Sequence, residues 1–141
     1  RFPKKEDGTI DEVEAERMLD HAIESGVTYI DTAYPYHDGE SEPFVGRVLK
    51  KYKREDFYLA TKLPMFKIDS LEQAKEIFEE QMKRLDVDYV DFYLLHDLNK
   101  DTWKKVIDLN IIPYCEELKK QGRIKNFGFS FHDDYEVFEV V

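Results

Sequence analysis

The sequence predicts an α/β fold in which a parallel sheet is covered by helices. Four short runs rich in Val, Ile, Tyr and Phe have the composition of strands: Val27–Ala33, Phe57–Lys62, Tyr89–His96 and Ile124–Ser130. Segments with apolar residues at helical spacing lie between consecutive runs. Because strands and helices alternate, we expect neighbouring strands to run parallel, with the helices packed outside the sheet.

The first predicted helix precedes the first strand. Asp11 can cap it, with Glu14 three residues later in a capping-box arrangement, and Gly26 is a suitable stop. Between these residues the apolar side chains recur at helical spacing: Ala15, Met18, Leu19, Ala22 and Ile23.

Two further helices are expected around the second strand. One begins at Ser41 and continues to Tyr52, and the other opens at Ser70 with Gln73 three residues later. The charged run Lys50–Asp56 is expected to be a solvated loop.

The stretch before the fourth strand has helical spacing but contains Pro113. Proline is tolerated in the first turn of a helix, where the N–H groups have no partner within the helix. We therefore predict two helices here, Asp101–Asp108 and a second that starts near Asn110.

The composition fits one folded domain. Of the 141 residues 42% are hydrophobic, which is enough for a packed core. The net charge of −10 argues against nucleic acid or a membrane surface as a partner, because both attract clustered Lys and Arg. No apolar run approaches the roughly 18 residues of a membrane span and no signal-peptide pattern opens the chain, so a cytoplasmic setting is expected. Cys115 is alone, which excludes an internal disulfide framework.

Polar residues occur where each predicted strand ends. These residues are Asp31, Lys62, His96 and Ser130, separated by 31, 34 and 34 residues, or about one strand–helix unit each. In (β/α)8 barrels and in open doubly wound sheets, ligands bind at the carboxyl ends of the strands. The four residues are therefore expected to line one ligand site.

The same residues suggest a proton donor. A lysine that ends a buried strand needs a charge partner, and Asp31 on the neighbouring strand can pair with Lys62. Tyr36 lies five residues after Asp31 and can reach over the site. A tyrosine hydroxyl has a pKa of about 10, and an adjacent ammonium favours its phenolate form. Together with a neutral His96, this group would polarise a carbonyl without a metal.

Other interpretations of these residues remain open at this stage. Asp31 and Lys62 can form a purely structural ion pair, and His96 can be a core histidine. Several tyrosines can be packing residues: Tyr34, Tyr36 and Tyr58. A metal site is a further alternative that would use rim residues: His37, Asp38, His96, Asp97 and His132. It is disfavoured because none of the pairs has a recognised ligand spacing and Lys62 would repel a cation.

Several segments resemble motifs of the aldo-keto reductase family. Asp31–Tyr36 followed by Gly39–Glu42 is similar to D-T-A-x-x-Y-G-x-S-E, lengthened here by two residues. Three later segments resemble the lysine strand, the histidine strand and the strand whose end contacts the nicotinamide: Ala60–Lys62, Tyr89–His96 and Gly122–Ser130. The resemblance covers nearly the whole chain in the right order.

The resemblance implies a catalytic tetrad and a cofactor. Tyr36 would be the general acid, Lys62 would promote its ionisation, Asp31 would anchor the lysine and His96 would orient the carbonyl. Ser130 would contact the cofactor, NADPH or NADH, with NADPH favoured. The implied activity is hydride transfer between the nicotinamide and a small-molecule carbonyl or alcohol, and no metal is implied.

The implied fold is a (β/α)8 TIM barrel, of which residues 1–141 would supply about strands 2 to 5 as one partial domain. A whole barrel takes about 250 residues. We therefore expect strand one and strands six to eight to lie outside this sequence. Four strands leave two open edges and an uncovered inner face with Val90, Phe92 and Leu94, so the chain alone is expected to be aggregated, molten or self-associated.

One departure from the family pattern follows Ser130, where Phe131 and His132 replace the usual Asn. The segment Gly128–His132 is similar to a microbial branch of predicted oxidoreductases that often carries an iron–sulfur segment after the barrel. No such segment occurs in these residues. Two classes of function stay open: a carbonyl reductase, and a non-catalytic binding or regulatory module, or inactive fragment, on the same fold.

Overall fold

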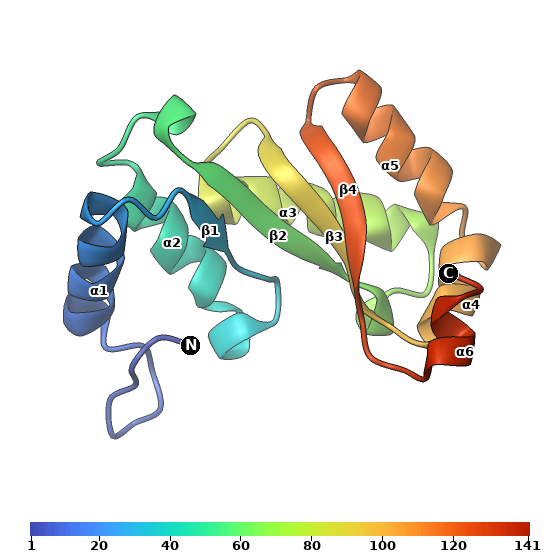
Figure 1. The fold of residues 1–141 in the computed structure, drawn as a ribbon, viewed down its shortest axis with the longest axis horizontal. Coiled ribbons are helices and arrows are strands. Elements are labelled where there is room, and N and C mark those ends of the chain that lie inside the picture. Colours follow the sequence, from blue (N-terminus) through green and yellow to red (C-terminus); the bar gives the residue numbers. More distant parts are fainter.

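The sheet contains four parallel strands in sequence order. The computed structural model describes residues 1–141 and places β1 (Tyr29–Asp31), β2 (Tyr58–Pro64), β3 (Val90–Leu98) and β4 (Ile124–Phe131) side by side (Figure 1). Each strand pairs in parallel with the next, so β1 and β4 form the two edges. The predicted parallel α/β sheet is confirmed.

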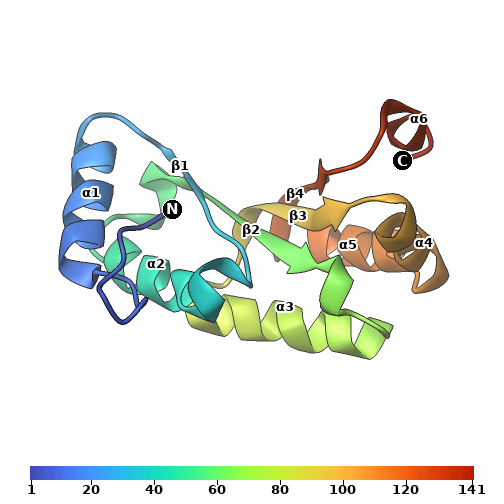
Figure 2. The same ribbon diagram turned by 90° about the horizontal axis from the view of Figure 1, so that it is seen from below.

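Five helices follow the order that the sequence predicts, and a short sixth helix comes after the fourth strand. Their bounds are α1 (Glu12–Glu24), α2 (Ser41–Leu49), α3 (Leu71–Leu85), α4 (Lys100–Asp108), α5 (Ile111–Lys120) and the short α6 (Tyr135–Phe138). Figure 2 shows α2 and α3 along one side of the sheet, whereas α6 lies on the other side. No helix is both long enough and apolar enough to cross a bilayer.

Local signals account for several helix boundaries. Asp11 accepts a hydrogen bond from the backbone of Glu14, and the hydroxyl of Ser70 accepts one from the backbone of Gln73. Gly26, just after α1, has a φ of 95°, a conformation that glycine adopts at little cost. Pro113 lies in the first turn of α5, as predicted.

Several predicted boundaries are wrong by a few residues. The helix expected to reach Tyr52 ends at Leu49. Within the expected solvated loop, residues Arg54–Asp56 form a 3₁₀ turn, and the Arg54 side chain is held by hydrogen bonds to Phe57, Tyr89 and Asp91. Tyr89 and Asp91 are 35 and 37 residues away, so local composition does not reveal these contacts.

The first strand is shorter than predicted, and the other three extend further at their carboxyl ends. β1 is shorter than Val27–Ala33, although its hydrogen bonds to β2 extend to Thr28 and Thr32. β2, β3 and β4 each run one or two residues past the predicted end. Lys62 and His96 therefore lie inside their strands, two residues before the ends.

The two faces of the sheet have different surroundings. Side chains on the helix-covered face are buried in the main core: Leu59, Leu63, Tyr93 and Leu95 from the strands, and Phe44, Phe78 and Ile111 from the helices. On the opposite face Tyr29 is 44% exposed and Tyr58 is 55% exposed, and both rings contact Phe92. This face is open, as expected for part of a barrel.

One residue of the expected open face is buried. Val90 has no exposed surface at the start of β3, whereas Phe92 and Leu94 are partly exposed. The backbone of Val90 also donates a hydrogen bond to the carbonyl of Arg123, next to the buried Ile124. The open face thus begins at Phe92 rather than at Val90. Self-association of the chain through this face stays a prediction.

Candidate active site

Strand register brings three of the predicted site residues onto one face. Asp31 pairs with Ala60, two residues before Lys62. Lys62 pairs with Leu94, two residues before His96. Because side chains alternate along a strand, steps of two keep all three on the same face of the sheet.

Lys62 is the centre of this group. Its side chain is 7% exposed, and its ammonium donates hydrogen bonds to the Asp31 carboxylate at 2.6 Å and to the Thr32 carbonyl at 2.9 Å. The negative charge of Asp31 offsets the free-energy cost of burying the ammonium. The ammonium also lies 5.0 Å from the centre of the Tyr36 ring.

Tyr36 comes from the loop between β1 and α2, at the start of a 3₁₀ turn (Tyr36–Gly39). Its ring lies near both the Lys62 ammonium and the His96 ring, whose centre is 5.7 Å away in an edge-on arrangement. The structure therefore brings the four predicted tetrad residues together at one end of the sheet.

His96 is partly buried next to Lys62. Burial lowers the pKa of its imidazole below the ordinary value of 6.5, and the Lys62 ammonium lowers it further. The ring also contacts Phe66, and its buried Nδ1 has no hydrogen-bond partner. The imidazole is therefore neutral at pH 7, the state in which it can donate one hydrogen bond without carrying charge.

Ser130 takes part in an irregularity between β3 and β4. Its hydroxyl accepts a hydrogen bond from the backbone of Asp97 at 2.9 Å. Asp97 has a φ of 61°, and the pairing between the two strands shifts between Leu95 and Leu98. The hydroxyl of Ser130 thus closes a bulge beside His96, a contact that its spacing in the sequence does not predict.

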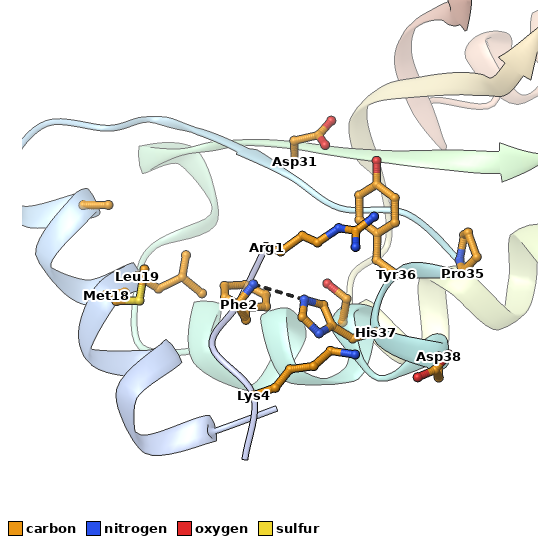
Figure 3. Close-up of a pocket in the computed structure, with 12 residues that line it drawn as sticks. Arg1, Phe2, Lys4, Met18, Leu19, Asp31, Pro35, Tyr36, His37 and Asp38 are labelled. Carbon is orange, nitrogen blue, oxygen red and sulfur yellow. Dashed lines mark hydrogen bonds between the residues drawn. The ribbon is translucent and has the colours of Figure 1, made fainter. Parts of the chain in front are cut away.

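The two residues that lengthen the family motif have an unusual backbone. His37 and Asp38 have φ values of 53° and 57°, in the left-handed region. His37 accepts a hydrogen bond from the backbone of Phe2 at 3.1 Å and lies against its ring. Burial, followed by the charge of Lys4, lowers the pKa of His37. This histidine ties the Tyr36 loop to the N-terminal segment (Figure 3).

A pocket of about 720 Å³ adjoins the group and is lined by both Asp31 and Tyr36. Figure 3 shows Arg1, Tyr36 and His37 around it, with Met18 and Leu19 of α1 on its apolar side. Among the rim residues considered as metal ligands, the structure holds no cluster of three or more His, Cys, Asp or Glu side chains that could bind a metal ion.

Sequence reasoning missed a buried polar group behind Lys62, formed by Glu42, Thr61, Gln81 and Tyr93. One signal was present in the sequence. Gln81 lies three residues after Phe78 and seven after Ala74, so it is a polar residue on the apolar face of α3.

The motifs and the fold agree with comparisons against known proteins. The model of the aldo/keto reductase family matches residues 2–141. The chain belongs to the aldo-keto reductase family. It is 37% identical over 122 residues to the uncharacterized oxidoreductase YqkF of Bacillus subtilis, which covers 80% of this chain and 38% of that protein. It is 30% identical over 129 residues to L-galactose dehydrogenase of Arabidopsis thaliana, 87% of this chain and 40% of that one.

Solved structures of the family match as well. An aldo-keto reductase from Bacillus halodurans in its holo form aligns with a TM-score of 0.72 and 37% identity, over 86% of this chain and 42% of that one. An aldo/keto reductase from Klebsiella pneumoniae in complex with NADP and acetate aligns with a TM-score of 0.75 and 26% identity, over 98% and 47%. The chain thus spans less than half the length of these relatives, and its four strands form part of the family's (β/α)8 barrel.

Proposed function

We propose that these residues carry the proton-donating part of the active site of an NAD(P)H-dependent carbonyl reductase. The observation that supports this is that the Tyr36 ring lies 5.0 Å from the Lys62 ammonium and 5.7 Å from the His96 ring. The strands that complete the barrel would correspond to the part of the family members that lies outside the match with this chain. A polypeptide that contains these residues and completes the barrel is called the closed-barrel protein here.

Tyr36 is the proton donor in this proposal. When a carbonyl is reduced, its oxygen gains negative charge and takes the hydroxyl proton of Tyr36. The Lys62 ammonium, 5.0 Å from the ring centre, stabilises the phenolate that remains. In the reverse direction the phenolate takes the proton back from an alcohol.

Asp31 and His96 have supporting roles. Asp31 holds the Lys62 ammonium in place through the 2.6 Å hydrogen bond. Because the pKa of His96 is lowered, its neutral ring donates a hydrogen bond to the carbonyl oxygen rather than competing with Tyr36 as an acid.

The residues present fit the nicotinamide end of a cofactor. The donor set of Tyr36, Lys62 and His96 suits an oxygen that becomes anionic, and the partly exposed Ser130 hydroxyl keeps a proton to donate to a carboxamide. A bound NADPH or NADH would supply the hydride. Family members of known structure include complexes with NADP and NADPH, which favours NADPH.

Small-molecule carbonyl compounds are the proposed substrates, and the cytoplasm is the proposed location. Relatives named as methylglyoxal reductases share 33–34% identity with this chain over 76–84% of it. The iron–sulfur segment implied by the microbial branch concerns residues outside this sequence and stays a prediction.

The test is cofactor binding followed by turnover. Purified closed-barrel protein is titrated with NADPH and NADH while nicotinamide fluorescence is followed, and it is then assayed on a panel of aldehydes and ketones. We expect binding together with oxidation of the cofactor by at least one carbonyl. Binding without turnover on any carbonyl would favour the non-catalytic module.

A further inference from the structure

Four polar side chains are buried on the helix-covered side of the sheet, directly behind Lys62. Glu42 of α2, Thr61 of β2, Gln81 of α3 and Tyr93 of β3 all have no exposed surface. Polar groups placed this deep are costly unless every one is hydrogen-bonded, so such a group fixes one arrangement of the elements that carry it.

Gln81 joins the members of this group. Its amide nitrogen donates to the Glu42 carboxylate at 2.7 Å and to the carbonyl of Lys62 at 3.0 Å, and its oxygen accepts from the Tyr93 hydroxyl at 2.8 Å. Thr61 donates its hydroxyl proton to Glu42 at 2.6 Å. The side chain of Thr61 is therefore held from α2, and the carbonyl of Lys62 is held from α3.

The neighbouring residue of α2 holds the other half of the ion pair. Ser41, also buried, shares a 2.9 Å hydrogen bond with the hydroxyl of Thr32. Thr32 directly follows Asp31, and its carbonyl is the second acceptor of the Lys62 ammonium. Ser41 and Glu42 are consecutive residues of α2. Ser41 therefore bonds to Thr32, the residue after Asp31, and Glu42 bonds to Thr61, the residue before Lys62.

The position of α2 is itself fixed by a close approach to α3. A Cβ atom at Gly46 would lie 2.7 Å from the carbonyl oxygens of both Arg84 and Leu85, closer than real Cβ atoms come. Glycine lets the two helix backbones approach, which sets Glu42 beside Gln81.

We propose that Ser41 and Glu42 are positioning residues that hold Asp31 and Lys62 in the geometry in which the ammonium meets the Tyr36 ring. Thr61 and Gln81 are the contacts through which Glu42 acts. The inference rests on the proposed reductase function, because only that function gives the ammonium a catalytic purpose. It adds to that function a support on the opposite face of the sheet.

The test uses variants that change one hydrogen bond on each side. Thr61→Val removes the hydroxyl that meets Glu42 at nearly constant volume, and Thr61→Ser keeps it. Ser41→Ala removes the bond to Thr32 and leaves a small side chain that α2 accommodates. Asp91→Asn is the matched control, because Asp91 is buried in the same sheet but bonds at the opposite ends of the strands.

The first measurement needs no catalysis. ¹⁵N NMR of the closed-barrel protein gives the rate at which the Lys62 ammonium protons exchange with water. We expect Thr61→Val and Ser41→Ala to raise this rate about tenfold, the size of effect expected when one hydrogen bond of restraint is lost. Thr61→Ser should restore the slow rate, and Asp91→Asn should not change it.

The second measurement is turnover of the closed-barrel protein. Thr61→Val and Ser41→Ala should lower kcat about tenfold with KM nearly unchanged, whereas Thr61→Ser and Asp91→Asn should keep kcat. If Thr61→Val does not fold, Ser41→Ala gives the answer alone.

Wild-type exchange rates in the variants, or equal acceleration in Asp91→Asn, would overturn the positioning role. Faster exchange of the Lys62 ammonium protons in Thr61→Val and Ser41→Ala, but not in Asp91→Asn, would support the positioning role. If Tyr36→Phe at the same time kept full turnover, the proposed function would be rejected.

Discussion

Two ion pairs of the same length lie at opposite ends of the sheet and differ in their exposure and in their hydrogen-bond partners. Lys62 and Asp31 pair at 2.6 Å near the carboxyl ends of β1 and β2, and Arg54 and Asp91 pair at 2.6 Å near the amino ends of β2 and β3. In the first pair the cation is 7% exposed and the carboxylate 41%, whereas in the second the values are 22% and 12%.

The Arg54 pair is enclosed by protein. The guanidinium lies against the rings of Phe57 and Tyr89 and donates to the carbonyls of both residues. Asp91 accepts a second hydrogen bond from the backbone of Leu59. These contacts join three segments of backbone, which is a structural role.

The Lys62 pair is open on one side. Asp31 lines the pocket, and the ammonium lies against a tyrosine ring rather than between two packing rings. The comparison shows that the length of an ion pair does not reveal its role. The two pairs differ in the number of their backbone partners and in the exposure of the carboxylate, and the pair proposed to serve chemistry is the one with fewer backbone partners and the more exposed carboxylate.

The largest expected effect concerns Tyr36, the residue beside the Lys62–Asp31 pair. Tyr36→Phe in the closed-barrel protein should lower turnover roughly 10²–10⁴-fold, because it removes the positioned general acid. Affinity for NADPH should change little, since the hydroxyl addresses the substrate. Steady-state kinetics and a fluorescence titration measure both. Turnover near the wild-type value would transfer the acid role to another residue, with His96 the first to examine.

The enclosed pair should respond in stability instead. Arg54→Met leaves the buried Asp91 carboxylate without its charge partner, and we expect a loss of about 2–4 kcal/mol in the free energy of unfolding. Urea denaturation followed by circular dichroism measures it. The kcat of the variant protein that remains folded should equal that of the wild type, and a large loss of kcat would erase the distinction between the two pairs.

Asp31→Asn should lower both stability and turnover. The Lys62 ammonium is 7% exposed and would keep only neutral acceptors such as the Thr32 carbonyl, so the free energy of unfolding should fall by about 2–4 kcal/mol. Turnover should also fall at least tenfold, because the ammonium loses the anchor that sets it against Tyr36. A variant that unfolds readily but turns over normally would show that this pair is structural too.

The smallest expected effect concerns His96 and pH. Its pKa in the folded protein is lowered, so as pH falls through 6.5 the unfolded chain binds a proton that the folded chain does not. Part of the stability present above pH 6.5 should therefore be lost as pH falls toward 5. His96→Asn should remove that part of the pH dependence in denaturation curves at pH 5, 6 and 7. An identical pH dependence in the variant would contradict the lowered value.

The sequence predicts the elements and the site because both depend on local patterns. The strand ends at Asp31, Lys62 and His96 recur once per strand–helix unit, and parallel pairing then places them on one face. The cap at Ser70 and the helix stop at Gly26 are signals of one or a few residues. Local patterns of this kind survive in any tertiary arrangement.

Features that depend on distant partners could not be predicted. Arg54 looks like a loop residue until Asp91, 37 positions later, is placed beside it. The bonds of Gln81 depend on how closely α2 approaches α3, and the bulge at Asp97 depends on β4. In each case the deciding contact is between elements, and no short window of sequence contains both sides.

The alternation of side chains along β2 has a consequence for how this protein can diverge. Lys62 lies on the face that carries Asp31, while Thr61, one residue earlier, faces Glu42 of α2 and Gln81 of α3. Pro35, His37 and Asp38 line the pocket but make no bond to Glu42 or Gln81. Under the proposed function, substitutions in the loop would change which compounds enter the pocket, while the groups proposed to transfer the proton would keep their places. The two faces of β2 thus divide the ion pair beside the pocket from the hydrogen bonds that hold the strand against α2 and α3.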